Sequence, residues 1–146
     1  MGSEMCIRDR YWHRPEQSRI SIVEGWLHSG DLACRDPEGY YSIVGRAKDL
    51  IICGGMNVYP REVERCLLEH QSVEEVAVVG IPDDEWGETV VAVVVGTVEA
   101  AALLAYAEDR LAPYKRPRKI FYAEDFPRNA MGKIQKSVLR ERYAQA

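Results

Sequence analysis

A chain of 146 residues with 47% hydrophobic content can bury one substantial core, but it is too short for two full domains. Its net charge of −4 argues against a general nucleic-acid-binding protein. There is no signal-peptide pattern, and no apolar run reaches the roughly 18 residues of a membrane-spanning helix. We therefore expect a cytoplasmic protein, and its scattered thiols suit that reducing compartment.

The cysteines and histidines do not predict a metal site. No two cysteines have C-x-x-C spacing, and the histidines form no cluster with them. The residues concerned are Cys6, Cys34, Cys53, Cys66, His13, His28 and His70. We expect no zinc, and no metal held by this chain.

The first third of the chain contains a leader and a hairpin. Residues 1–10, MGSEMCIRDR, continue into no later pattern, and we interpret them as a non-native leader or adaptor scar. Turn residues 36–39, Asp-Pro-Glu-Gly, separate residues 32–34 from residues 40–44. This arrangement predicts a β-hairpin.

A short apolar strand and a helix come next. In DLIICGGMN the strand ends at Gly54-Gly55, and Pro60 then stands in the first turn of a helix. Val63, Cys66 and Leu67 fall on one face of that helix.

Two valine-rich runs, VEEVAVVGI and TVVAVVVG, follow around a turn at residues 82–84. They are too short for helices and too continuous for half-exposed strands, so they predict a sheet covered by helices. A helix over 100–111, a strand over 119–122 and a helix over 135–143 complete the pattern. The fold class is α+β, a small mixed domain of short strands covered by about three helices.

Lys133 is singled out by its position after a glycine, behind a Pro-Arg-Asn turn, in PRNAMGKIQK. A turn restricts where the ammonium can point, which suits stabilisation of negative charge on a phosphate and a carboxylate together. The alternative is one more solvated lysine in a basic tail. That tail, residues 113–142, carries nine Lys/Arg against three Asp/Glu, and it either faces anions or docks on an acidic surface.

Three other positions each allow two interpretations. Asp31, after Gly30 at a strand start, can accept two hydrogen bonds from ribose hydroxyls or cap its own backbone. Arg46, at a strand end, offers a planar fork to phosphate or ribose oxygens or pairs with a surface carboxylate. Gly54-Gly55 allows a ligand or another backbone to approach closely or simply ends a strand.

Five segments in sequence order resemble the carboxyl-terminal part of the adenylate-forming superfamily, which includes acyl-CoA synthetases, peptide-synthetase adenylation domains and luciferases. These segments are GWLHSGDL, GYYSIVGRAKDLIICGGMNVYPREVE, VAVVGIPDDEWGE, LAPYKRP and PRNAMGKI. The resemblance extends from about Tyr11 to the end. SGDL, GGMNVYPREVE and the final segment YAEDFPRNAMGKIQKSVLRERY are most similar to malonyl-CoA synthetases, which ligate malonate to coenzyme A.

The resemblance implies a two-step acid–CoA ligase. ATP and a carboxylate give an acyl-adenylate and pyrophosphate, and the thiol of coenzyme A then displaces AMP. It implies that residues 11–47 end a large amino-terminal AMP-binding domain, which holds most of the substrate contacts and Mg²⁺. Residues 48–146 then form a mobile carboxyl-terminal domain that docks on it, and the fragment alone is not expected to catalyse.

By motif position, the resemblance also implies residue roles. Lys133 would bridge the attacking carboxylate and the α-phosphate, Asp31 would bind the ribose hydroxyls, and Arg46 would reach the ribose or phosphates. Lys48 would be the hinge between two poses of the small domain. In the second pose the glycine loop at Gly54-Gly55 would lie along the pantetheine tunnel.

Two alternative functions remain open from the sequence. One is an adenylation domain that loads a carrier protein instead of free coenzyme A. The other is a non-catalytic nucleotide-sensing module that keeps the fold without the chemistry.

Overall fold

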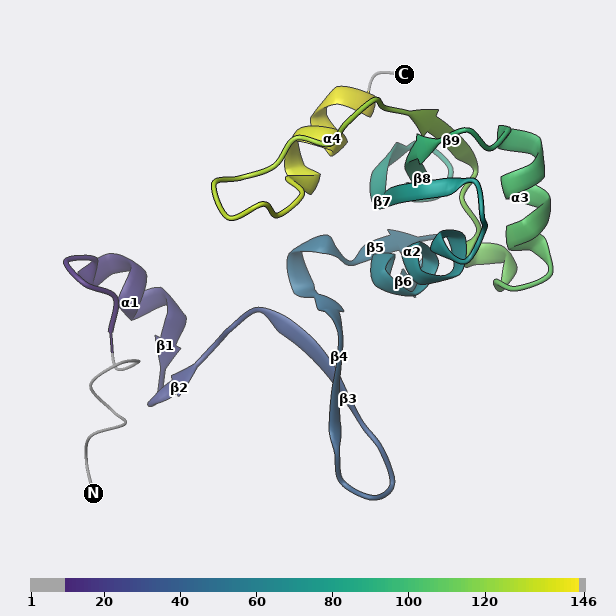
Figure 1. Ribbon diagram of the computed structural model, residues 1–146. Helices are drawn as coiled ribbons and strands as arrows, with labels where there is room; N and C mark the ends of the chain where they lie inside the picture. Colours follow the sequence, from purple (N-terminus) through teal and green to yellow (C-terminus); the bar gives the residue numbers. More distant parts are fainter. Residues whose placement is uncertain (1–9, 145–146) are drawn as a thin grey trace.

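The computed structural model describes residues 10–144, which form a small mixed domain preceded by an extended amino-terminal part (Figure 1). Of the predicted leader at 1–10, residues 1–9 lie outside the described residues. In chain order the elements are α1 (Pro15–Ser21), β1 (Ile22–Val23), β2 (Trp26–Leu27), β3 (Asp31–Arg35), β4 (Tyr41–Arg46), η2 (Ala47–Asp49), β5 (Ile51–Cys53), β6 (Met56–Val58), α2 (Pro60–Leu68), β7 (Val73–Asp83), β8 (Gly87–Gly96), α3 (Ala100–Glu108), η3 (Pro113–Lys115), β9 (Lys119–Tyr122) and α4 (Lys136–Tyr143).

A five-stranded sheet forms the centre of the domain, in the order β6-β5-β8-β7, with β9 beside β8. β7 and β8 pair antiparallel, from Val73 opposite Gly96 to Asp83 opposite Gly87. β9 runs parallel to β8, so the sheet is mixed. Valine dominates β7 and β8 because its branched side chain packs well on a pleated surface.

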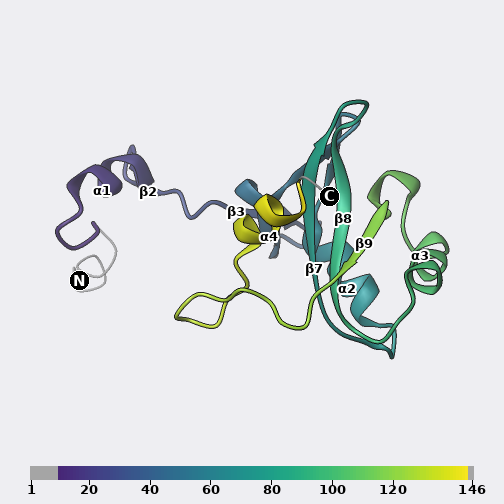
Figure 2. The ribbon, with the colours of Figure 1, turned by 90° about the horizontal axis from the view of Figure 1, so that it is seen from above.

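Alternate side chains of β7 and β8 enter two separate cores. Figure 2 shows the sheet nearly edge-on, with α4 on one side and α2 and α3 on the other. The core under α2 and α3 receives Val76, Val78, Val90, Ala92 and Val94. The core under α4 receives Ala77, Val79, Ile81, Val91 and Val93. Both strands are therefore covered on both faces, which confirms the predicted helix-covered sheet and the α+β class.

Helix α2 begins at Pro60, as predicted, because proline has the helical φ and lacks the N–H that a first turn leaves unbonded. Val63 and Leu67 are fully buried against the sheet. Cys66 is only partly buried, and this burial raises the pKa of its thiol.

The side chain of Glu62 joins α2 to η3. It accepts two hydrogen bonds from Lys115 Nζ, at 2.7 and 2.9 Å. These hydrogen bonds raise the pKa of Lys115 above its ordinary value. The ammonium therefore stays charged over the whole physiological pH range.

A second glutamate of α2 occupies the outer edge of β7. Glu64 Oε1 accepts the backbone N–H of Val78 at 2.8 Å. The same oxygen lies 2.5 Å from Lys136 Nζ of α4, and the Lys136 and Glu64 side chains are only 19% and 17% exposed. One carboxylate thus joins α2, β7 and α4.

The amino-terminal part extends away from the domain (Figure 1), and no side chain of residues 10–50 is buried. Its predicted hairpin is confirmed as β3 and β4, with a turn in which Asp36 Oδ1 accepts the N–H of Tyr40 at 2.8 Å. Several large apolar side chains of this part are at least 71% exposed: Trp12, Ile20, Trp26, Tyr40 and Tyr41.

The structure corrects the sequence prediction at several boundaries. Helix α1 and strands β1, β2 and β6 were not predicted, because they are short and bury at most one side chain, Val58. β7 continues through Pro82 and Asp83, where a turn was predicted, since proline is tolerated on a strand at the sheet edge. Helix α3 ends at Glu108, before the predicted residue 111. None of the described helices is long and apolar enough to cross a bilayer.

We predict that Leu67→Ala lowers the free energy of unfolding by about 2–5 kcal/mol, because the truncated side chain leaves a cavity between α2 and the sheet. Its neighbour Leu68 is 48% exposed, and Leu68→Ala should change stability by only about 0.5 kcal/mol. Urea unfolding of the two variants measures both values. Equal losses would contradict the packing described for α2.

Candidate functional site

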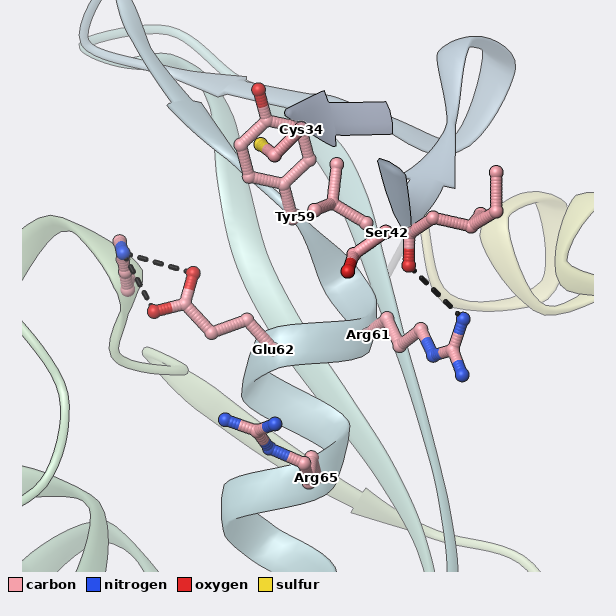
Figure 3. A pocket seen from close by; sticks show the side chains of 9 residues that line it. Cys34, Ser42, Tyr59, Arg61, Glu62 and Arg65 are labelled. Atoms are coloured by element: carbon pink, nitrogen blue, oxygen red, sulfur yellow. Dashed lines mark hydrogen bonds and ion pairs between the residues drawn. The ribbon is translucent and has the colours of Figure 1, made fainter. Parts of the chain in front are cut away.

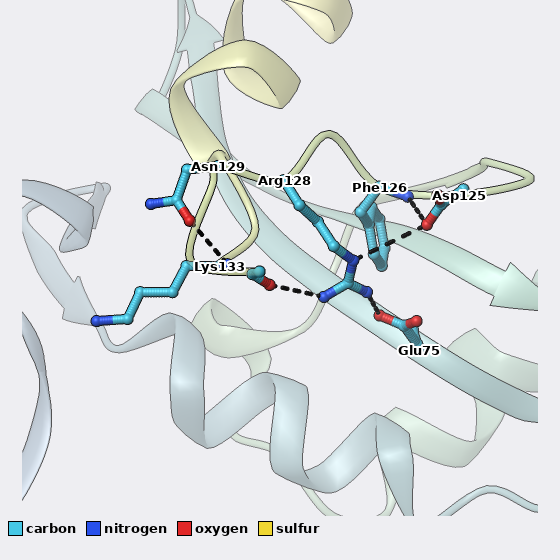
Figure 4. Close-up of polar contacts among 7 residues, drawn as sticks. Glu75, Asp125, Phe126, Arg128, Asn129 and Lys133 are labelled. Carbon is cyan, nitrogen blue, oxygen red and sulfur yellow. Dashed lines mark hydrogen bonds and ion pairs between the residues drawn. The ribbon is translucent and has the colours of Figure 1, made fainter.

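Lys133 lies in the loop between β9 and α4, which backbone hydrogen bonds close into a narrow turn. The N–H of Asn129 donates to the carbonyl of Lys133 at 2.9 Å. The Asn129 side-chain oxygen accepts the N–H groups of Met131 and Lys133, each at 3.0 Å. Gly132, at φ +76°, reverses the chain just before Lys133. The Lys133 backbone is therefore held in place, while its side chain extends into solvent (Figure 4).

Asp31 and Arg46 are direct cross-strand neighbours in the β3–β4 hairpin. Arg46 Nε lies 2.7 Å from Asp31 Oδ1, and the two side chains are 49% and 27% exposed. Arg46 thus pairs with a carboxylate, as one of its two interpretations expected, and that carboxylate belongs to Asp31. The backbone N–H of Asp31 donates to Ser29 Oγ at 3.2 Å, while its carboxylate pairs with Arg46. The nucleotide-binding roles of both residues stay predictions.

Lys48 lies in the single turn of 3₁₀ helix, η2, that connects the hairpin to the sheet. The N–H of Ala47 donates to the carbonyl of Gly30 at 2.9 Å, which holds the start of this turn. Lys48 itself is exposed. Its hinge role is not tested by a single conformation and stays a prediction.

Arg46, Lys48 and Lys133 line one cavity of about 580 Å³. Lys136 and Arg140 of α4 also line it, and among the described residues Asp49 is the only carboxylate of its wall. Lys48 and Lys133 form no ion pair with any described residue. Arg140 Nε is buried and has no hydrogen-bond partner within residues 10–144. This excess of positive charge makes the cavity a candidate anion-binding site.

Asp31 belongs to a neighbouring cavity of about 420 Å³. That cavity shares Arg46 and Lys136 with the first, and Glu64 also lines it. Arg46 therefore connects the predicted ribose-binding carboxylate to the cavity of Lys133. The structure brings Arg46, Lys48 and Lys133 to one cavity. Asp31 lies in the neighbouring cavity, where it pairs with Arg46.

The Gly54–Gly55 turn lines neither cavity. Both residues have positive φ, +56° and +77°. The N–H of Gly54 donates to the carbonyl of Trp86 at 2.8 Å, and a Cβ on Gly54 would lie 2.7 Å from Trp86 Cε3. A Cβ on Gly55 would meet no atom within 4 Å. The two glycines therefore differ: Gly54 admits a close neighbour within the protein, and Gly55 leaves open space.

A further cavity of about 470 Å³ lies between the hairpin and α2 (Figure 3). Cys34, Tyr59 and Arg65 contribute to its wall. Arg61 Nη1 crosses from α2 to the hairpin and donates to the carbonyl of Ile43 at 3.3 Å. None of the site residues predicted from the sequence lines this cavity.

The sequence prediction missed Lys136, Arg140 and Asn129. Lys136 and Arg140 are four residues apart, so a helix starting at residue 136 places them on one face, toward Lys133. Asn129 precedes Lys133 by four residues, a spacing at which an asparagine side chain can accept hydrogen bonds within a turn. These spacings were visible in the sequence, but they became informative only once the turn was known.

The basic tail is largely used within the domain. Lys115 pairs with Glu62 and Lys136 with Glu64. Arg116 donates to the carbonyls of Leu111 and Glu108, and Arg118 stacks over the Trp86 ring, while Arg128 contacts Glu75. Most cations of the tail are therefore engaged within the domain, whereas Lys133 forms no ion pair with a described residue and lines a cavity.

Comparisons with known proteins identify the family of this domain. Residues 62–133 match the family described as "AMP-binding enzyme C-terminal domain". The long-chain-fatty-acid–CoA ligase FadD13 of Mycobacterium tuberculosis is 47% identical over 97% of this chain and 29% of its own length. ATP-bound MatB from Rhodopseudomonas palustris has a TM-score of 0.84 at 43% identity, over 92% of this chain and 28% of that one. The o-succinylbenzoate CoA synthetase MenE from Bacillus subtilis, in complex with its acyl-adenylate intermediate, has a TM-score of 0.85 at 41% identity, over 90% and 28%.

The comparisons thus identify the fold as that of a small carboxyl-terminal domain of AMP-binding enzymes. The chain belongs to the AMP-binding enzyme family and carries its carboxyl-terminal domain. It spans about three-tenths of the length of the relatives it matches.

We predict that Gly54→Ala destabilises the chain more than Gly55→Ala. Each alanine has to adopt the left-handed conformation, at about 1–2 kcal/mol. Only the Cβ at position 54 also collides with Trp86, which adds about 1–3 kcal/mol of overpacking. Urea unfolding of the two variants measures the difference, and equal losses would refute the close approach of Gly54 to Trp86.

Proposed function

We propose that this chain is the carboxyl-terminal part of an acid–CoA ligase, which makes an acyl-adenylate from ATP and a carboxylate and then an acyl-CoA. The observation that carries the proposal is the cavity in which Lys133, Lys48 and Arg46 converge. A cavity with this excess of cations suits a substrate that develops negative charge, as ATP and a carboxylate do when they react. The CoA ligase names of the matched relatives support coenzyme A, rather than a carrier protein, as the thiol.

Lys133 has the properties required of the group that stabilises adenylation. A carboxylate oxygen attacks the α-phosphorus, the bond to pyrophosphate breaks, and negative charge concentrates on the oxygens between the acid and the phosphate. An ammonium carried by a rigid turn and directed at these oxygens favours this transition state over the separated ground state. Arg46 would contact the ribose or phosphates and Asp31 the ribose hydroxyls, each exchanging its present partner for the nucleotide.

The exposed amino-terminal part supports the proposed domain division at Lys48. Residues 10–47 bury no side chain, yet they expose Trp12, Ile20 and Trp26 by at least 76%. Such a surface requires cover from other apolar groups. We assign residues 11–47 to the end of a large AMP-binding domain and residues 48–146 to a small domain that docks on it. The chain by itself would then lack most of the substrate contacts and would not catalyse.

Malonate is our proposed acid. This choice is supported by three segments that are most similar to those of malonyl-CoA synthetases: SGDL, GGMNVYPREVE and YAEDFPRNAMGKIQKSVLRERY. We also propose a cytoplasmic location, where ATP and coenzyme A are both present.

Magnesium has no fitting site among the described residues. They contain no group of three His, Cys, Asp or Glu side chains able to hold a metal ion. In the proposal the ion that accompanies ATP is held by the large domain, and no step of this chain depends on it.

We predict that Lys133→Ala in the full-length enzyme slows adenylation by about 100- to 1,000-fold, the loss typical when one preorganised donor is removed from a charged transition state. Pyrophosphate exchange measures this half-reaction. Thioester formation from a supplied acyl-adenylate serves as the internal control and should be nearly unchanged. An unaltered exchange rate would remove Lys133 from the chemistry.

The proposed rotation about Lys48 leads to a prediction about the thioester step. In the proposal the small domain rotates about Lys48, withdraws Lys133 and brings the Gly54–Gly55 turn to the pantetheine arm. Lys48→Pro fixes φ near −65° and restricts this rotation. It should slow thioester formation by about tenfold or more while adenylation stays within about threefold. Equal loss in both half-reactions would show that Lys48 is not the hinge.

A further inference from the structure

We propose that Arg128 is a positioning residue for Lys133, because it holds the lysine-bearing turn against strand β7. This inference rests on the proposed function, in which Lys133 acts in adenylation. It concerns a residue that does not line the cavity itself and would act only through the loop.

The guanidinium of Arg128 reaches three points at once. Its Nη1 donates to the carbonyl of Gly132, the residue before Lys133, at 3.1 Å. Its Nη2 contacts the carboxylate of Glu75 on β7. Its Nε lies 4.0 Å from Asp125 Oδ1, at the start of the loop. Figure 4 shows the guanidinium between the turn and the strand. A planar fork can serve such divergent partners, whereas a lysine ammonium presents a single point.

The turn has no apolar anchor of its own. Phe126, before it, is 4% exposed in the core under α4, and Ile134, after it, packs against the same core. All side chains of residues 128–133 are exposed. The hydrogen bonds of Asn129 fix the shape of the turn, but they do not join it to the sheet. Among the described residues, the Arg128–Glu75 ion pair makes that connection.

The expected effect is on rate rather than on stability. The Arg128 and Glu75 side chains are 35% and 43% exposed, and ion pairs this accessible contribute little to unfolding equilibria. Catalysis is more sensitive, because a displacement of about 1 Å at a reacting group can slow a reaction about 100-fold. Loss of the contact should therefore displace Lys133 while leaving the domain folded.

The experiment compares half-reactions in the full-length protein. Arg128→Ala should lower the kcat of adenylation, measured by pyrophosphate exchange, by about 10- to 100-fold. The KM for ATP, the melting temperature and thioester formation from supplied acyl-adenylate should stay nearly unchanged. Glu75→Gln should lower adenylation in the same direction by a smaller factor. Glu74→Gln, at the exposed neighbouring position of β7, is the matched control and should retain the parent rate.

A double variant separates positioning from any independent role. In Lys133→Ala the target of positioning is already gone, so adding Arg128→Ala should slow adenylation no further. An additional tenfold loss in the double variant would overturn the inference, as would equal loss in both half-reactions of Arg128→Ala. If Lys133→Ala slows adenylation and Arg128→Ala does not, only this inference fails. If Lys133→Ala has no effect, the proposed function itself fails.

Discussion

The strand pair β7–β8 is apolar on both faces, and the arrangement of the domain depends on covering it twice. Helices α2 and α3 cover one face, and α4 has to cover the other. The chain therefore crosses the sheet between the end of β9 at Tyr122 and the start of α4 at Lys136. This crossing segment carries Lys133. The position of the candidate catalytic lysine thus follows from the burial of valine side chains that never touch a substrate.

The same arrangement explains how an acidic chain presents a positive cavity. Glutamates of α2 and β7 are paired with Lys115, Lys136 and Arg128, so these carboxylates are engaged inside the domain. Lys48 and Lys133, which form no ion pair within residues 10–144, lie together at the junction of the hairpin and the small domain. Local pairing, rather than net charge, therefore determines where an anion can bind.

Sequence patterns predicted the elements that are strongly buried or marked by clear turn residues, as the β3–β4 hairpin is, and missed short exposed elements. The continuous valine runs and Pro60 located β7, β8 and α2, because two-sided burial and a helix start each leave a clear pattern. Strand β6 and helix α1 left none, since they are short and largely exposed. At the site, motif order predicted roles for Lys133, Arg46 and Asp31, and these stay predictions. Arg128 was not identified, because its partner Glu75 is 53 residues away and no local spacing relates them.

The position of Glu64 affects whether a second molecule can add a strand to the edge of the sheet. The outer edge of a sheet is a template on which a strand from a second molecule can add, and this is a common start of aggregation. On this edge of β7, the N–H of Val78 donates a hydrogen bond to the Glu64 carboxylate. Lys136 holds that carboxylate in place. A mostly buried ion pair on a valine-rich edge thus occupies a backbone group with which an added strand would have to pair.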